Sequence, residues 1–208
     1  RALVEEKLVD GWDDPRMPTL CGLRRRGFTP TSIFSFVQRS GISKALSLCD
    51  INLLDHCIRE ELNASAPRRM AVLDPLEVEI TNFGEDETVY FDVVNNPEDP
   101  SAGTRKVPFT KHLYIERADF SDNPPPKFQR LKPDSEVRFM SAYVVKCNEV
   151  IYGKDGRPAK LLCTVDPETA GCNPPDGRKI KGTIHWVSAA HAKTAEVRLY
   201  DRLFTIED

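Results

Sequence analysis

"EVRFMSAYVVKCNEVIYGKDGRPAKLLCTV", residues 136–165, alternates apolar with polar side chains over much of its length. Val137, Phe139 and Val145 fall on one face of an extended chain, because successive side chains of a β-strand point to opposite faces. Asp155–Gly156 then interrupts the alternation with a dipeptide that is typical of tight hairpin turns. The stretch therefore predicts neighbouring antiparallel strands with one buried face.

The same two-residue period continues through most of the chain after about residue 74. Further strands are predicted over residues 76–80, 88–93, 106–120, 179–188 and 196–204. The proline-rich segment "FSDNPPPKFQ", residues 120–129, is predicted to be a loop. Because no helical pattern separates these strands, we expect an antiparallel, all-β closed barrel.

The chain before residue 70 follows a helical pattern instead. Helices are predicted in "PTLCGLRRRG" (18–27), "TPTSIFSFVQRSG" (29–41) and "DINLLDHCIREELNASAP" (50–67). Gly27 would end the first helix, one of Thr29, Thr31 or Ser32 would cap the second, and Asp50 would cap the third. The fold class predicted is therefore α+β with segregated parts, helical over residues 1–70 and barrel over residues 71–208.

Composition and motifs exclude several classes of function. No apolar run approaches the ~18 residues of a membrane helix, so no membrane partner is expected. The net charge of −3 argues weakly against nucleic-acid binding, although an acidic protein can still present a local basic surface, and no DNA partner is expected. The six cysteines lack metal-ligand spacing, and scattered reduced thiols are expected rather than a metal site. No P-loop, GxSxG, HExxH or dinucleotide-binding pattern is present, so we expect no catalytic residue in this chain.

Four segments carry a resemblance to a known family. They are "GWDDPRMPTLCGLRRRGFTPTSI" (11–33), "CIREELNASAPRRMAVLDPL" (57–76), "KVPFTKHLYIERADF" (106–120) and "DGRKIKGTIHWVSAAHA" (176–192). Taken in order, they resemble the glutaminyl-tRNA synthetase family of class I aminoacyl-tRNA synthetases. The similar region of that family begins just after its ATP-binding KMSKS-type loop and runs through its proximal anticodon-binding barrel.

This resemblance implies an activity, a location and partners. Residues 1–70 would be a stem-contact subdomain, and residues 71–208 an anticodon-binding, ribosomal-protein-like barrel, with a distal barrel starting near the C-terminus. The parent would be a cytoplasmic ligase that joins glutamine to tRNA(Gln) using ATP with Mg²⁺. ATP and glutamine would bind an upstream catalytic domain, so this segment alone would hold no cofactor and be inactive.

The resemblance also implies site residues. Arg68, Asn96 and Arg138 match anticodon contacts of the family, and Lys127, Gln129 and Arg130 match the loop around the third anticodon base. Exposed base edges are how proteins usually read single-stranded RNA.

The "RRR" run at residues 24–26 leaves two interpretations open. Arg24, Arg25 and Arg26 match a segment of the family that lies along the inner side of the tRNA, where they would contact backbone phosphates. They could equally neutralise helix carbonyls or pair with Asp13 and Asp14. Three consecutive helical residues span ~200° of arc, so both interpretations can hold at once.

Two alternatives remain for the function. One is a glutamate-specific or nondiscriminating glutamyl-tRNA synthetase with the same kind of barrel. The other belongs to a different class, a non-catalytic RNA-binding module.

Overall fold

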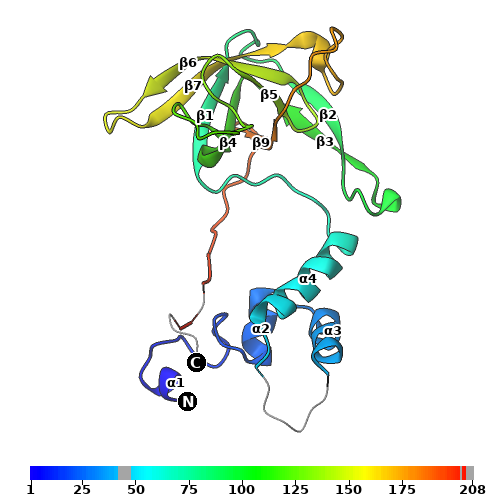
Figure 1. The fold of residues 1–208 in the computed structure, drawn as a ribbon, viewed down its shortest axis with the longest axis vertical. Coiled ribbons are helices and arrows are strands. Elements are labelled where there is room, and N and C mark those ends of the chain that lie inside the picture. Colours follow the sequence, from blue (N-terminus) through cyan, green and yellow to red (C-terminus); the bar gives the residue numbers. More distant parts are fainter. Residues whose placement is uncertain (42–47, 202, 205–208) are drawn as a thin grey trace. The chain divides into compact units, whose positions relative to one another are not determined.

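The computed structural model describes residues 1–41, 48–201 and 203–204. The chain divides into two compact units, one made of Arg1–Ala66 with Glu196–Asp208 and the other of Pro67–Ala195. Figure 1 shows helices in the first unit and strands in the second. The predicted α+β class with segregated parts is confirmed. None of the helices in the described ranges is both long enough and apolar enough to span a membrane.

The first unit contains the α-helices. They are α1 (Ala2–Glu5), α2 (Leu20–Arg26), α3 (Pro30–Ser40) and α4 (Ile51–Ser65). The side chains of Thr19, Thr29 and Asp50 cap α2, α3 and α4 by accepting backbone N–H bonds, which satisfies donors that the first turn leaves open. Gly27 ends α2 with a φ of 107°, a left-handed conformation that favours glycine.

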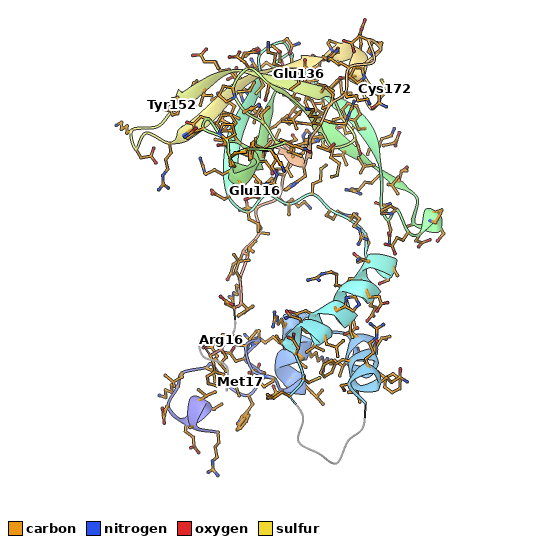
Figure 2. The ribbon with its side chains drawn as sticks, in the orientation of Figure 1. Arg16, Met17, Glu116, Glu136, Tyr152 and Cys172 are labelled. Atoms are coloured by element: carbon orange, nitrogen blue, oxygen red, sulfur yellow. The ribbon has the colours of Figure 1, made fainter. Side chains whose placement is uncertain are left out.

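The loop before α2 is fixed around one buried carboxylate. Asp14 is 1 % exposed and accepts bonds from the Arg16 guanidinium at 2.9 and 2.7 Å and from the backbone N–H of Asp10 at 3.0 Å. Figure 2 marks Arg16 in this loop. The Arg16 side chain and these backbone donors hold the pKa of Asp14 well below its usual value.

The second unit contains the strands and three short 3-10 helices. The strands are β1 (Pro75–Ile80), β2 (Val89–Val94), β3 (Thr104–Phe109), β4 (His112–Glu116), β5 (Glu136–Phe139), β6 (Val144–Tyr152), β7 (Pro158–Asp166), β8 (Thr183–Ile184) and β9 (Trp186–Ser188). The 3-10 helices are η1 (Pro100–Ala102), η2 (Arg117–Asp119) and η3 (Pro167–Thr169). Residues 106–120, predicted as one strand, break into β3 and β4.

Seven strands form one sheet in the order β8-β5-β6-β7-β1-β4-β9, while β2 and β3 form a separate hairpin. Only His185 separates β8 from β9, so one continuous segment borders both edges of the sheet and brings it close to a closed barrel. The all-antiparallel expectation is wrong for two pairings, since β1–β7 and β5–β8 run parallel. Long stretches of chain separate the strands of each parallel pair, as parallel neighbours require.

Aromatic rings fill the space between the barrel and the β2–β3 hairpin. Phe109 makes edge-to-face contacts with Tyr143 and Trp186, with ring centroids 5.1 and 5.0 Å apart. Phe91 of β2 also contacts Tyr143 edge-to-face, at 5.2 Å. Trp186 is fully buried, and its indole N–H donates to the carbonyl of Met140 at 3.1 Å. The inward faces predicted from the alternation therefore form one core.

The strand predicted over residues 196–204 is wrong for the residues that the structure describes there. These residues alternate in sequence but adopt no strand, and Leu199 is 82 % exposed. A strand needs a partner for its backbone groups, and the described ranges provide none here. Residue 202 of this predicted strand lies outside the described residues.

Candidate nucleic-acid interface

Two segments far apart in the sequence form an open pocket of about 500 Å³ in the second unit. One is the loop that begins at Lys127, and the other leads into β8. The lining residues are Lys127, Phe128, Gln129, Arg130, Lys132, Ser135, Glu136, Arg178, Lys179, Ile180, Lys181 and Gly182. The three predicted loop residues, Lys127, Gln129 and Arg130, thus lie together on one surface.

A tight turn shapes the entrance of the loop. The backbone N–H of Phe128 donates to the carbonyl of Pro125 at 3.1 Å, which closes a four-residue turn. Lys127 occupies its third position with a φ of 69°, a left-handed conformation that glycine or asparagine adopts more readily. The turn therefore places a strained, exposed lysine at the pocket.

A glycine lets the two segments approach closely. A Cβ atom on Gly182 would lie 1.8 Å from the carbonyl oxygen of Gln129 and 3.1 Å from Cγ2 of Val137. The Gly182 carbonyl accepts the backbone N–H of Arg138 at 2.9 Å, so this segment is fixed to β5 as well. The shape of the pocket thus depends on the absence of a side chain at Gly182.

Uncompensated lysines give the pocket its charge. In the described part of the chain, no carboxylate lies within 4.0 Å of the ammonium groups of Lys127, Lys132, Lys179 or Lys181. Four separated cations without partners attract a polyanion more than they stabilise the fold.

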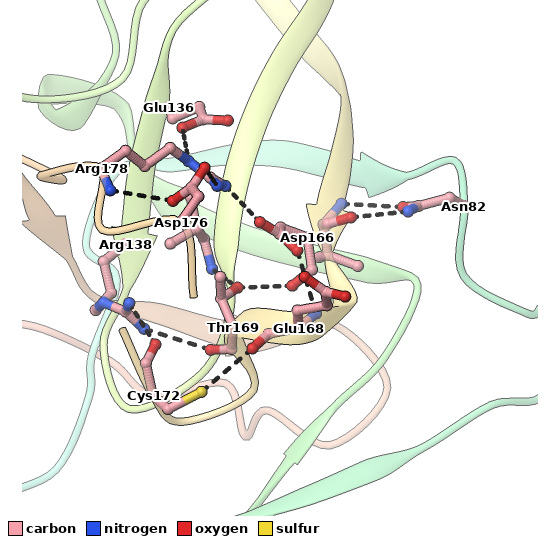
Figure 3. A network of polar contacts seen from close by, with 11 residues as sticks. Asn82, Glu136, Arg138, Asp166, Glu168, Thr169, Cys172, Asp176 and Arg178 are labelled. Atoms are coloured by element: carbon pink, nitrogen blue, oxygen red, sulfur yellow. Dashed lines mark hydrogen bonds and ion pairs between the residues drawn. The ribbon is translucent and has the colours of Figure 1, made fainter. Parts of the chain in front are cut away.

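Arg178 contrasts with these lysines. Its guanidinium bonds the carboxylates of Glu136 at 3.0 Å, Asp176 at 2.6 Å, and Asp166. These partners raise the pKa of Arg178 above its usual value. Figure 3 shows Arg178 among these three carboxylates. Arg178 therefore joins β5, β7 and the segment before β8. The four pocket lysines have no such carboxylate partners in the described ranges and can contact a ligand.

A buried carboxylate holds the Arg130 side chain. Nη1 of Arg130 lies 2.9 Å from Oδ1 of Asp119 and donates to the carbonyl of Ala118 at 3.2 Å. Burial raises the pKa of Asp119, while Arg130 and His185 oppose that rise. Both contacts use Nη1, and among the described residues Nη2 and Nε of Arg130 have no partner. That edge of the guanidinium can donate to a ligand.

Arg138 serves the structure of the barrel. Its Nη2 donates to the carbonyl of Cys172 at 2.6 Å, and its Nη1 donates to that of Ala142 at 3.3 Å. Figure 3 shows the guanidinium against the loop that follows β7. Arg138 does not line the pocket. Its contact with an anticodon base stays a prediction, beside this evident role in positioning the loop.

Arg68 and Asn96 both lie near the turn of the β2–β3 hairpin, where the chain leaves β2. The half-buried Arg68 donates its backbone N–H to the carbonyl of Asn95 at 2.6 Å. Asn96 is 1 % exposed, and its side-chain oxygen accepts the backbone N–H of Glu98 at 3.0 Å. The Asn96 side chain thus shapes the turn after β2, and its contact with an anticodon base stays a prediction.

The three consecutive arginines of α2 have different surroundings within the first unit. Arg25 pairs with Asp13 at 3.2 Å, whereas Arg26 lies over the ring of Phe28 at 5.8 Å from its centroid. Arg24 lines an apolar groove beside Leu20 and Phe34. Asp14, the other proposed acidic partner, binds Arg16 instead. The pairing interpretation therefore describes Arg25, and the phosphate interpretation stays a prediction.

Sequence reasoning missed Lys179 and Lys181 as site residues. The run "RKIKG" at 178–182 was a usable signal, because it concentrates three cations beside a glycine. The alternation of residues 179–188 predicts a strand and gives no sign of a binding surface. No group of three or more His, Cys, Asp or Glu side chains in the described ranges could hold a metal ion.

Three family models match the chain. Residues 66–166 match the anti-codon binding domain of "tRNA synthetases class I (E and Q)", and residues 183–208 match a second anti-codon binding model of that group. Residues 1–64 match the catalytic domain of the same group.

Curated relatives agree with these matches. The chain is 54 % identical over 203 residues to a protein of Clostridium kluyveri named glutamine–tRNA ligase, covering 98 % of this chain and 36 % of the relative. It is 55 % identical over 202 residues to the protein of that name from Bradyrhizobium diazoefficiens, covering 97 % and 36 %. The Rhodopirellula baltica protein of that name is 53 % identical over 206 residues, covering 99 % and 34 %. The chain thus spans about a third of the length of these relatives.

Proposed function

Because this chain belongs to the class I (E and Q) tRNA synthetases, we propose that it is the tRNA-binding part of a ligase that joins glutamine to tRNA(Gln). In this proposal, residues 71–208 bind the anticodon and residues 1–70 follow the inner face of the tRNA. The location is the cytoplasm. The relatives named glutamine–tRNA ligase support the choice of amino acid.

The observation that carries the anticodon role is the pocket between residues 127–136 and 178–182. It combines four lysines that lack carboxylate partners within the described ranges with Arg130, whose guanidinium is held at one edge by Asp119. Single-stranded RNA needs both kinds of group, since cations hold the phosphates and a planar fork of donors reads a base edge. Phe128 in the same pocket offers an aromatic ring for stacking.

The chemistry of the ligase belongs to the parent protein. ATP with Mg²⁺ would activate glutamine there, but this chain contains no phosphate-cradling motif and no cluster of metal-binding side chains among its described residues. The residues present do not fit a site for ATP with Mg²⁺, so no catalytic step through ATP is assigned to this segment.

A titration tests the proposal. The chain is titrated with tRNA(Gln) and tRNA(Glu), whose anticodons differ at the third base, at several salt concentrations. We expect tighter binding of tRNA(Gln) and a steep loss of affinity with salt, because each phosphate contact releases condensed counterions. Equal affinities would favour a nondiscriminating anticodon site, and tighter tRNA(Glu) binding would favour a glutamate enzyme. No salt-dependent binding of either tRNA would refute the proposed function.

A further inference from the structure

Two arginines converge on one amide oxygen at the turn end of the β2–β3 hairpin. Nη1 of Arg69 and Nη1 of Arg105 each donate to Oδ1 of Asn95, both at 3.4 Å. Arg69 precedes β1, whereas Arg105 belongs to β3. The fold therefore brings two cations together from separate parts of the second unit.

Backbone contacts hold these side chains in place. The Asn95 amide nitrogen donates to the carbonyl of Ala102 at 2.8 Å, which directs its oxygen toward the arginines. Nη1 of Arg105 also donates to the carbonyl of Val94 at 3.2 Å, and Nη1 of Arg69 donates to that of Arg68 at 2.9 Å. All of these arginine contacts use Nη1. In the described residues, Nη2 and Nε of both groups are left for another acceptor.

The charge of the pair is not compensated. No carboxylate of the described chain lies within 4.0 Å of either guanidinium, whereas the neighbouring Lys106 has Asp92 at 2.6 Å. Partial burial, and secondly the proximity of Arg69, lower the pKa of Arg105. Like charges held together and partly desolvated oppose folding, and such groups gather where a ligand of opposite charge binds.

We propose that Arg69 and Arg105 form a binding site for a phosphodiester group of RNA. Two guanidiniums offer planar, charge-assisted donors that match phosphate oxygens. The site is distinct from the pocket around Arg130, because neither arginine lines that pocket. The inference rests on the proposed function, since it assigns a further contact to the same RNA.

A phosphate contact and a base contact give different results. A phosphate contact holds every RNA sequence equally, so its loss weakens all RNAs alike and reduces the salt dependence. The slope of log K against log salt falls by about 0.7 for each single-stranded phosphate lost. A base contact changes the affinity for one sequence and leaves the slope unchanged.

The experiment measures binding of anticodon stem-loop RNAs to the 208-residue chain at four salt concentrations. The variants are Arg69→Gln, Arg105→Gln and the double variant, with Arg157→Gln as the matched control. Arg157 is an exposed arginine near the β6–β7 turn, with no ion pair in the described ranges. Each protein is tested with the glutamine loop and a loop of scrambled sequence, and thermal unfolding is recorded without RNA.

We expect each single variant to lose about tenfold in affinity at low salt for both loops, as befits one charge-assisted contact. The double variant should also show a smaller slope of log K against log salt. Arg157→Gln should bind like the unchanged chain. The unfolding temperature of Arg69→Gln should stay the same or rise, because a like-charge repulsion disappears.

Other outcomes overturn the inference. An unchanged slope in the double variant, while the unchanged chain binds RNA, refutes the phosphate site and leaves the proposed function standing. A loss confined to the glutamine loop assigns the arginines to a base and refutes the backbone contact. A lower unfolding temperature with unchanged affinity makes the pair structural. Failure of the unchanged chain to bind either loop refutes the proposed function, and this inference with it.

Discussion

Replacing Gly182 by alanine tests whether the pocket depends on the close approach of its two segments. The new Cβ would lie 1.8 Å from the carbonyl oxygen and 3.0 Å from the carbonyl carbon of Gln129. Both are backbone atoms, so no side-chain rotation relieves the overlap. The segments must separate by roughly 1.5 Å to reach ordinary contact.

This separation should affect both stability and binding. The segment at Gly182 is fixed to β5 through Arg138, and the loop is fixed where Leu131 donates its N–H to the carbonyl of Asp119 at 3.0 Å. Overpacking between fixed elements costs about 1–3 kcal/mol of unfolding free energy. Because the loop also carries Arg130, RNA affinity should fall together with stability.

Chemical denaturation and stem-loop binding measure the two effects. The matched control is Gly153→Ala, where the nearest atom to a new Cβ is a side-chain oxygen of Asp155 at 2.8 Å, which can rotate away. We expect the control to keep both properties. Unchanged stability and affinity in Gly182→Ala would show that the approach of the segments does not shape the pocket.

Three further predictions concern charged groups. Arg130→Lys keeps the positive charge but loses the planar fork of donors. The binding free energy should weaken by about 1–3 kcal/mol for a stem-loop with the glutamine anticodon, and by much less for an RNA altered at the third base. Equal losses for the two RNAs would contradict base reading by Arg130. The double variant Lys179→Gln, Lys181→Gln should bind all tRNAs more weakly and to the same extent. The slope of log K against log salt should fall by about 0.7 to 0.9 per lost contact, and an unchanged slope would show that neither lysine contacts the RNA. Asp14→Asn should destabilise the helical unit near pH 7. Arg16 lowers the folded-state pKa of Asp14, so the ionised carboxylate stabilises the folded state above the unfolded-state pKa of about 3.9. This stabilisation is lost as pH falls toward the folded-state pKa. The unfolding curves of the unchanged chain and of Asp14→Asn should therefore converge in acid.

The sequence predicts the parts of the fold that depend on local patterns. Thr29, Asp50 and Gly27 act at helix ends as expected, because capping depends on groups within a few residues of the end. The alternation in 136–165 likewise predicts β5, β6 and β7. The break between β3 and β4 was missed. At this break the Thr110 hydroxyl donates to the His112 carbonyl at 3.0 Å and lies 2.8 Å from the Ser188 hydroxyl, and no local pattern encodes the contact with Ser188.

The candidate site was predictable only in part. The resemblance pointed to Lys127, Gln129 and Arg130, and these residues do line one pocket. The opposite wall was missed, because it forms only where Gly182 meets the backbone of Gln129. The carboxylate that holds Arg130 was missed for the same reason, since Asp119 is brought close by the fold.

The single segment that runs through β8, His185 and β9 determines where this chain can be divided. A truncation between the two anti-codon binding matches, which end at residue 166 and resume at residue 183, would remove the strands that pair with β5 and β4. Both of those strands would then expose unpaired backbone groups, and such exposed edges template aggregation. A barrel that is to be produced separately and stay soluble must therefore extend through Ser188. It then includes residues that match the second anti-codon binding model.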